Sequence, residues 1–216
     1  MCIRDRVKSD QEESIIALRE AMAAHKGVEV QVEESPVGDS ASNGYVESAI
    51  RQVQKQIRTF KCYLEYRLKT KLSWDHPILP WLVRHAGATI NRYNIGKDGQ
   101  TAHQRVRGRP FSAHVTDLGE CVWFKLVKGN TRGKLDSKWG KGVWLGIREE
   151  SNESFIGTPA GVIKVRTFRR RGSDEERWNL EEVNAFRGVP WEPIPGREGV
   201  KIRSRVYVPV LSLIHI

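Results

Sequence analysis

The most constraining feature of the sequence is a long stripe of apolar residues with helical spacing. Between residues 46 and 64 an apolar side chain returns after every three or four positions. The members of this stripe are Val46, Ile50, Val53, Ile57, Phe60 and Leu64. Such a repeat places every member on one face of an α-helix of about five turns or more. The spacing therefore predicts a long helix that packs one side against the rest of the fold.

A second stripe, made of polar residues, runs beside the first on the same predicted helix. Its members are Glu47, Arg51, Gln54, Arg58 and Lys61, and Lys55 adds a further positive charge. The simplest interpretation is a solvated face on which Glu47 and Arg51 form an i,i+4 ion pair worth about 0.2–0.5 kcal/mol. The alternative is that the basic residues contact the phosphates of a nucleic acid.

The remainder of the first half alternates between helix, strand and loop patterns. Apolar spacing and turn residues predict, in chain order, a helix at 11–25, a strand at 28–32, a loop at 33–43 and helices at 78–94 and 101–106. The first half is therefore expected to be α/β and rich in helix.

From Gly119 onward the pattern is typical of β-structure. Short apolar runs separated by Gly or Asn turns predict strands at 121–124, 143–147, 154–157 and 161–166. Four or five such strands favour a small barrel of the SH3-like kind. Composition also shifts near residue 118 toward Trp, Gly and Arg, which predicts a domain boundary there. Beyond Gly172 the chain is charged and rich in Pro, which predicts a linker.

The charge balance points to a polyanionic partner. The chain has 36 Lys and Arg residues against 26 Asp and Glu residues, a net charge of +10. Basic residues interleaved with Trp123, Trp139 and Trp144 are typical of a nucleic-acid surface, although tryptophans of small barrels more often lie in the core. The predicted contacts in this half are Lys138, Arg169 and Arg170.

Cysteine content and hydropathy exclude several other classes. Cys62 and Cys121 have no paired spacing, which argues against a disulfide framework or a Cys-type zinc site and favours a reducing compartment. No stretch approaches the ~20 consecutive apolar residues of a membrane helix, so we expect no membrane partner.

Asp10 and Glu47 are the candidate metal ligands. Asp10 ends a short β-like run, Glu47 opens the long helix, and 36 residues lie between them. Two carboxylates on separate elements, brought together by folding, are a usual way to hold Mg²⁺ against a phosphate. The alternative is structural, because the helix dipole favours a Glu in a first helical turn without any metal.

Several segments in a fixed order resemble one protein family. These are Ser42–Glu47, Ile90–Tyr93, Asp98–Ala102 with Val106–Pro110, and Lys134–Trp139 with Gly142–Gly146. Over roughly residues 7–170 they resemble the integrases of copia-type retrotransposon Pol polyproteins. The resemblance implies the C-terminal part of an RNase H-like catalytic core at 7–112, a small SH3-like β-barrel at 113–172 and a linker at 173–210.

The resemblance also implies an activity and a set of partners. Integrases insert element DNA into host DNA by phosphoryl transfer at two Mg²⁺ or Mn²⁺ ions. Asp10 and Glu47 would be two of the metal ligands. The partners would be element ends, target DNA and further integrase copies, in the nucleus. Arg51, Gln54, Lys55, Arg58 and Lys61 would lie along the DNA.

Both ends of the chain resemble adapter-encoded sequence. Residues 1–6 and 211–216 can be encoded by strings that are reverse complements of each other, as in a sequencing-library adapter, and are set aside. We therefore expect Val7–Val210 to be native, the first catalytic Asp to be missing and the chain itself to be inactive. Gln11-Glu12 and Ser48 depart from the family pattern, as in a decayed copy. A rival hypothesis from another class is a non-catalytic nucleic-acid or chromatin-binding protein.

Overall fold

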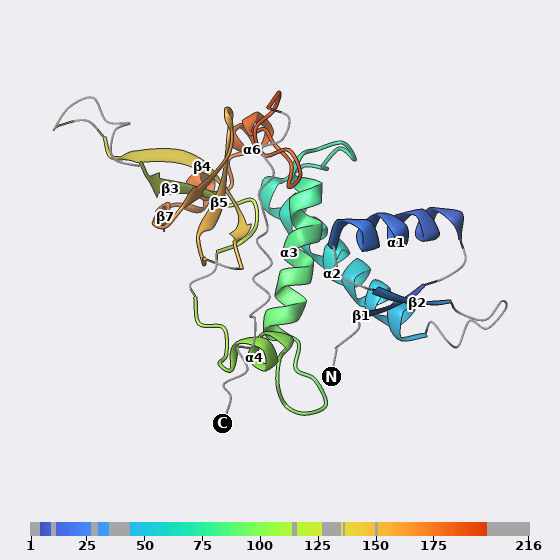
Figure 1. Ribbon diagram of the computed structural model, residues 1–216. Coiled ribbons are helices and arrows are strands. Elements are labelled where there is room, and N and C mark those ends of the chain that lie inside the picture. The colour runs from blue at the N-terminus through green and yellow to red at the C-terminus, as the bar shows by residue number, and fades with distance from the viewer. Residues whose placement is uncertain are drawn as a thin grey trace. The chain divides into compact units, whose positions relative to one another are not determined.

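The structure is a computed structural model in which the chain forms two compact units, residues 1–55 and 56–216 (Figure 1). It describes residues 5–9, 12–26, 30–34, 44–113, 116–126, 135, 137–149 and 151–197. Asp10 lies outside this described part, as do both ends of the chain. The division between the units falls inside the long helix predicted from the apolar stripe.

The first unit is a small α/β arrangement. It contains β1 (Asp5–Ser9), α1 (Glu13–Lys26), β2 (Val30–Glu34) and the first part of α2 (Gly44–Leu68). β1 and β2 pair in parallel, with Val7 opposite Val32, and α1 supplies the crossover that a parallel pair requires. The buried Arg19 of α1 donates to Ser9 Oγ at 3.2 Å and to Glu34 Oε1 at 3.5 Å, which ties the helix to both strands.

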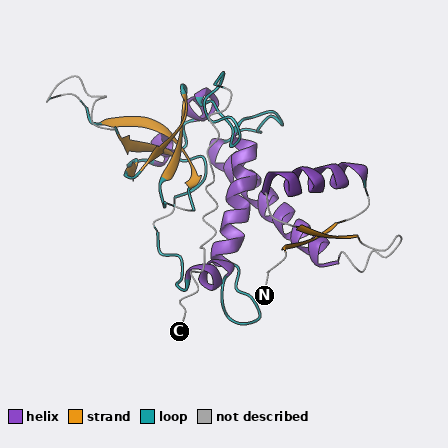
Figure 2. Cartoon of the chain, viewed as in Figure 1, coloured by secondary structure: helices purple, strands orange, loops and turns teal. Residues whose placement is uncertain are grey.

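The second unit combines helices with a five-stranded antiparallel sheet (Figure 2). Its helices are the rest of α2, α3 (Ile78–Tyr93), α4 (Ala102–Arg107), α5 (Asp174–Arg177) and α6 (Leu180–Ala185). Its strands are β3 (Cys121–Lys125), β4 (Trp139–Ile147), β5 (Ser154–Thr158), β6 (Gly161–Val165) and β7 (Phe168–Arg170). The strand order is β6-β5-β4-β3-β7, so four strands form a meander and β7 returns to pair with β3.

A single hydrophobic cluster joins the helices to one face of this sheet. Leu64 of α2 and Trp81 of α3 are buried in it together with Val143 and Phe155 of the strands. The predicted boundary between residues 112 and 113 therefore does not separate two cores. The change in composition near residue 118 marks a change from helix to strand, and both kinds of element bury the same cluster.

The segment predicted as a linker is folded in its described part. Trp178, Val183 and Phe186 are at most 9% exposed and belong to the same core cluster. The Phe186 ring packs so closely on Gly157 that an added Cβ there would meet it at 2.8 Å. Charge and Pro content suggested a linker, but Val183 of α6 and the residues that end α5 and α6, Trp178 and Phe186, suffice to dock this segment. The observed architecture is mixed α/β, and the more specific SH3-like and RNase H-like assignments stay predictions.

The helix predicted from the apolar stripe is confirmed as α2, and its burial changes along its length. Leu64 is 1% exposed within the core of the second unit, whereas Val46 and Ile50 are 56% and 50% exposed. The C-terminal half of the stripe therefore carries the packing that the sequence predicts. No helix of the described part is long and apolar enough to cross a membrane.

Candidate nucleic-acid interface

The candidate interface begins with the alternation of side chains along β3. Val122 and Phe124 are buried in a second hydrophobic cluster on one face of the sheet. Because successive side chains of a strand point to opposite faces, Trp123 and Lys125 lie on the other face. Trp123 is half-buried and Lys125 is exposed. This end of β3 therefore presents one aromatic and one basic side chain away from the second cluster.

The neighbouring strands place more residues of the same two kinds beside them. Trp123 is opposite Lys141 of β4 and opposite Arg169 of β7, and Lys125 is opposite Trp139 of β4. Residues directly opposite each other on paired strands share a face of the sheet. These five residues therefore form one surface, which we call the cation–aromatic face.

Contacts between cations and rings organise this face. Lys141 Nζ lies 5.2 Å from the centre of the Trp123 ring, and Arg169 Cζ lies 5.0 Å from the Trp139 ring. The buried Arg171 approaches Trp123 at 5.1 Å. At exposed positions each such contact is worth about 0.5–1 kcal/mol. The contacts hold these charged groups over the rings, with Lys141 and Arg169 exposed and Arg171 buried and paired with Glu182.

The face carries three positive charges, and acids lie nearby in α5, which contacts β3, and in Glu182, which pairs with Arg171. Lys125, Lys141 and Arg169 are exposed, while Trp123 and Trp139 are half-buried. Within the described residues, none of the three cations forms an ion pair with an acid. The arrangement can therefore neutralise phosphates and offer ring surface to bases at the same place.

The third tryptophan of the predicted surface has a different environment. Trp144 is 0% exposed and lies in the second hydrophobic cluster, with its ring edge-on to His85 at 5.6 Å. The sequence expectation that barrel tryptophans lie in the core holds for Trp144. Trp123 and Trp139 lie on the opposite face, further along their strands than the buried Cys121 and Val143, and are only half-buried there.

Two neighbouring arginines that the sequence treats alike have separate environments. Arg169 lies on the cation–aromatic face, whereas Arg170 is opposite Val122 and so points to the other face. Arg170 Nε and Nη2 donate to the fully buried Glu120 carboxylate, both at 2.8 Å. Thr116 Oγ1 also donates to Glu120, at 2.5 Å. These contacts give Arg170 a structural role in anchoring β7.

The predicted residues of α2 fall into two groups. Glu47, Arg51, Gln54 and Lys55 are exposed residues of the first unit, and Arg58 is exposed in the second. Their suggested DNA contacts stay predictions, because nothing in the structure brings them to a ligand.

Lys61 is occupied by an acid of its own helix. Its Nζ lies 3.2 Å from Glu65, which also accepts a hydrogen bond from Lys71 Nζ at 2.8 Å and one from the Leu72 backbone. Chiefly through Lys71, these contacts lower the pKa of the buried Glu65 to about 2. A phosphate at Lys61 would have to compete with this carboxylate. Lys138, by contrast, is exposed immediately before β4.

The predicted metal pair stays a prediction. Asp10 lies outside the described residues, and Glu47 is exposed in the first turn of α2. In the part of the chain that the structure describes, no group of three or more His, Cys, Asp or Glu residues could hold a metal ion. Cys62 and Cys121 are both free thiols, the first exposed and the second buried. Burial raises the pKa of the Cys121 thiol to about 11.

Fold and site together define a mixed α/β chain whose antiparallel sheet carries basic residues interleaved with tryptophan. Neither a protein-family model nor a curated protein matches the sequence. Among solved structures, the chain is similar to one chain of the cryo-EM structure of the simian T-cell lymphotropic virus intasome in complex with PP2A regulatory subunit B56 gamma. The identity is 16% and the TM-score 0.36, over 78% of this chain and 58% of that one. A likeness at this level carries no argument about fold or function.

Proposed function

We propose that this chain binds nucleic acid through the cation–aromatic face. The observation that carries the proposal is the alternation of three exposed cations with two half-buried tryptophans on adjacent strands. Lys and Arg that neutralise phosphates release counterions, and this release supplies most of the non-specific affinity for nucleic acid. Tryptophan rings add stacking surface for unpaired bases.

The number of cations sets the expected salt dependence. Three phosphate contacts give a slope of log K against log salt of about −2.7 on duplex DNA and about −2.1 on a single strand. Base stacking would add about 1–3 kcal/mol per base on a single strand only. We therefore expect the single strand to bind at least as tightly as the duplex, with the weaker salt dependence.

Salt titrations of binding to labelled single-stranded and duplex oligonucleotides, followed by fluorescence anisotropy, test the proposal. Lys141→Met removes one charge from the face and is expected to lower the magnitude of the duplex slope by about 0.9. The matched control is Lys97→Met, which makes the same charge change at an exposed residue outside the face. Equal slopes for the two variants would exclude the cation–aromatic face as the binding surface.

The finer proposal is that the chain belongs to a copia-type integrase. It is supported by the order of the family-like segments between residues 42 and 146. On this proposal residues 7–112 are part of an RNase H-like core and the sheet belongs to an SH3-like module. Element ends, target DNA and further integrase copies are then the partners, and the nucleus is the location.

In an integrase Asp10 and Glu47 would help to hold the Mg²⁺ or Mn²⁺ ions that promote phosphoryl transfer. Glu47→Gln in a longer protein that contains this chain is expected to abolish DNA joining and to leave DNA binding nearly unchanged. Glu20→Gln, an exposed acid of α1, is the matched control. Joining that persists in Glu47→Gln would remove Glu47 from the site. DNA binding by a longer protein that never joins DNA would favour the non-catalytic alternative.

A further inference from the structure

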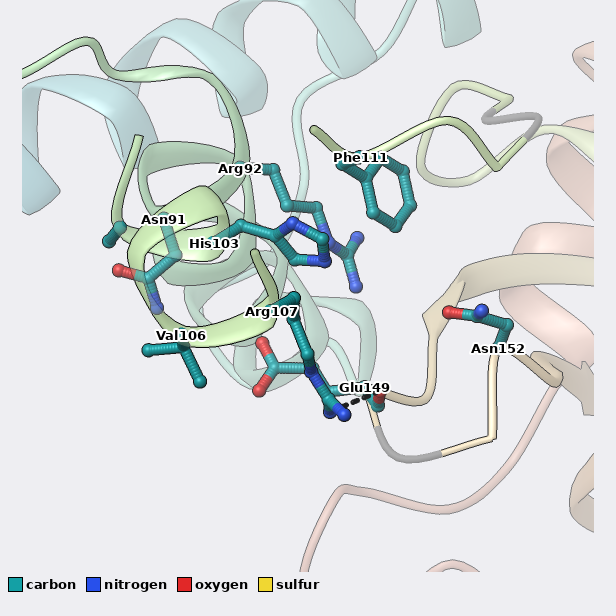
Figure 3. Close-up of a pocket in the computed structure, with 9 residues that line it drawn as sticks. Asn91, Arg92, His103, Val106, Arg107, Phe111, Glu149 and Asn152 are labelled. Carbon is teal, nitrogen blue, oxygen red and sulfur yellow. Dashed lines mark hydrogen bonds between the residues drawn. The ribbon is translucent and has the colours of Figure 1, made fainter. Parts of the chain in front are cut away.

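A second basic site lies in the second unit, at a pocket of about 190 Å³ (Figure 3). The pocket is bordered by the end of α3, by α4, by the segment that follows α4 and by the turn between β4 and β5. The lining side chains that matter for its chemistry are Asn91, Arg92, His103, Arg107, Phe111 and Asn152. None of them belongs to the cation–aromatic face.

Arg92 is the central residue of this pocket. It is 6% exposed, and its guanidinium stacks on the Phe111 ring with Cζ 4.4 Å from the ring centre. Figure 3 shows its charged end beside the Phe111 and His103 rings. Within the described residues, its guanidinium makes no hydrogen bond and no ion pair. A guanidinium has five N–H donors, and no nitrogen of Arg92 is among the fully buried unpaired atoms of the described residues, so these donors face the open pocket. The pocket therefore holds donors that the protein leaves without acceptors.

One acid borders the pocket without pairing with Arg92. Burial lowers the pKa of Arg92, and the attraction of Glu149 opposes this effect only in part. Glu149 is itself exposed, and its backbone oxygen accepts a hydrogen bond from Arg107 Nη2 at 3.2 Å. This bond fixes the second guanidinium at the pocket while using only one of its nitrogens. The pocket therefore has two positive charges, from two guanidinium groups, against the one negative charge of a solvated carboxylate.

Apart from the aliphatic Ala102 and Val106, the other lining groups are planar or carry amides. The His103 and Phe111 rings meet edge-on at 5.4 Å, and His103 Nδ1 is held at 3.2 Å from the Arg109 backbone oxygen. The side-chain amides of Asn91 and Asn152 make no hydrogen bond within the described part of the chain. The pocket thus combines cations, flat surfaces and unpaired amide groups.

We propose that this pocket binds one nucleotide, with its phosphate on Arg92 and Arg107 and its base against Phe111 and His103. Arginine is well suited to phosphate because its fork can donate two parallel hydrogen bonds. Bases pack on aromatic rings and on guanidinium planes alike, and amides can pair with their edges. The volume lies below the range of about 300–1,000 Å³ that encloses a whole drug-sized ligand. The pocket therefore encloses only part of the nucleotide, and the rest of that nucleotide and of its strand stays outside.

The test is a titration of the full chain with dAMP and, separately, with inorganic phosphate, followed by NMR of isotope-labelled histidine. dAMP is expected to shift the ring signals of His103, which lines the pocket, and to leave in place those of His76, which contacts Asn184 of α6 and does not line the pocket. Phosphate alone is expected to bind more weakly than dAMP. Equal affinities would overturn the proposal, because they would reduce the pocket to a bare anion site.

Two variants locate the binding. Arg92→Met keeps an apolar contact with Phe111 and is expected to weaken dAMP binding about tenfold or more. Arg107→Met changes an exposed residue of α4 and is expected to weaken it severalfold even if Arg92→Met does not fold. Lys97→Met is the charge-matched control. Unchanged dAMP affinity in Arg107→Met and in any folded Arg92→Met would overturn the proposal.

This inference can fail independently of the proposed function. Lys141→Met is expected to change the salt slope on duplex DNA while the His103 shift with dAMP is retained. If dAMP fails to shift the His103 signals while Lys141→Met still lowers the salt slope, only the pocket proposal is contradicted. If dAMP shifts the His103 signals while Lys141→Met leaves the salt slope unchanged, only the proposal for the cation–aromatic face is contradicted.

Discussion

The ion pair between Glu120 and Arg170 leads to an asymmetric prediction. The Glu120 side chain is 0% exposed, whereas the Arg170 side chain is 39% exposed. Removal of Arg170 therefore leaves a buried carboxylate whose one remaining side-chain donor among the described residues is the Thr116 hydroxyl. Removal of the Glu120 charge leaves a guanidinium that already reaches water. The same pair should thus have two different costs, depending on which partner is lost.

The magnitudes follow from these exposures. Breaking a buried ion pair by removing one partner costs about 3–5 kcal/mol, and we assign this value to Arg170→Met because Glu120 has no access to solvent. Glu120→Gln keeps the side-chain shape and a hydrogen-bond acceptor, and the released guanidinium is solvated, so we expect about 1–2 kcal/mol. In the double variant Glu120→Gln/Arg170→Met no uncompensated charge is buried. We therefore expect it to be more stable than Arg170→Met alone.

Urea unfolding followed by tryptophan fluorescence gives the free energy of unfolding of all three variants and of the parent chain. Equal losses for the two single variants, or losses that add in the double variant, would refute the reasoning. The same variants also separate structure from binding. Under conditions in which it stays folded, Arg170→Met is expected to retain the duplex salt slope, in contrast to Lys141→Met.

Two further predictions concern packing and pH. Burial, aided by the nearby Arg92 charge, lowers the pKa of His85 to about 4, so the folded state holds this ring neutral. As pH falls from 6.5 toward 4, the unfolded chain takes up the proton first, and the free energy of unfolding should fall by about 3 kcal/mol. In urea unfolding, His85→Leu should lose that part of the pH dependence. A pH dependence of stability that is unchanged in this variant would contradict the prediction. Gly157→Ala should cost about 1–3 kcal/mol because its Cβ would meet Phe186 at 2.8 Å. Gly87→Ala, inside α3 with no atom within 4 Å, should instead stabilise its helix by about 0.5–1 kcal/mol, and equal melting temperatures for the two variants would contradict the packing argument.

Local periodicity was enough to predict most elements of the second unit. The apolar stripe predicted α2, and short apolar runs between turn residues predicted β3 to β6 close to their observed positions. Strand β7 was missed because Phe168–Arg170 offers one apolar residue in three. Helices α5 and α6 were missed because their local composition is charged. What fixes them is distant in sequence: the packing of Trp178 and Phe186 against a core built from earlier elements.

The candidate site was predictable in kind but not in detail. Charge alone suggested both Arg169 and Arg170, yet only strand register assigns them to opposite faces. Register is set by hydrogen bonds between segments distant in sequence, since Trp123 pairs with Arg169, 46 positions on (169 − 123), and with Lys141, 18 positions on (141 − 123). No local pattern contains it. The pair Asp10 and Glu47 was inferred from spacing and resemblance, and it stays a prediction.

The cation–aromatic face exists because the helices cover only part of their side of the sheet. Cys121 and Val143 on this side are buried in the main core, whereas Trp123 and Trp139 lie further along the same strands and are half-buried. Rings at such positions are stabilised by cations that lie over them, at about 0.5–1 kcal/mol per contact. A phosphate that draws Lys141 away from Trp123 forfeits that contact and exposes ring surface. A base that stacks on the exposed ring restores the loss. Single-stranded nucleic acid can therefore contact both the cations and the rings of the face, whereas a duplex can contact only the cations.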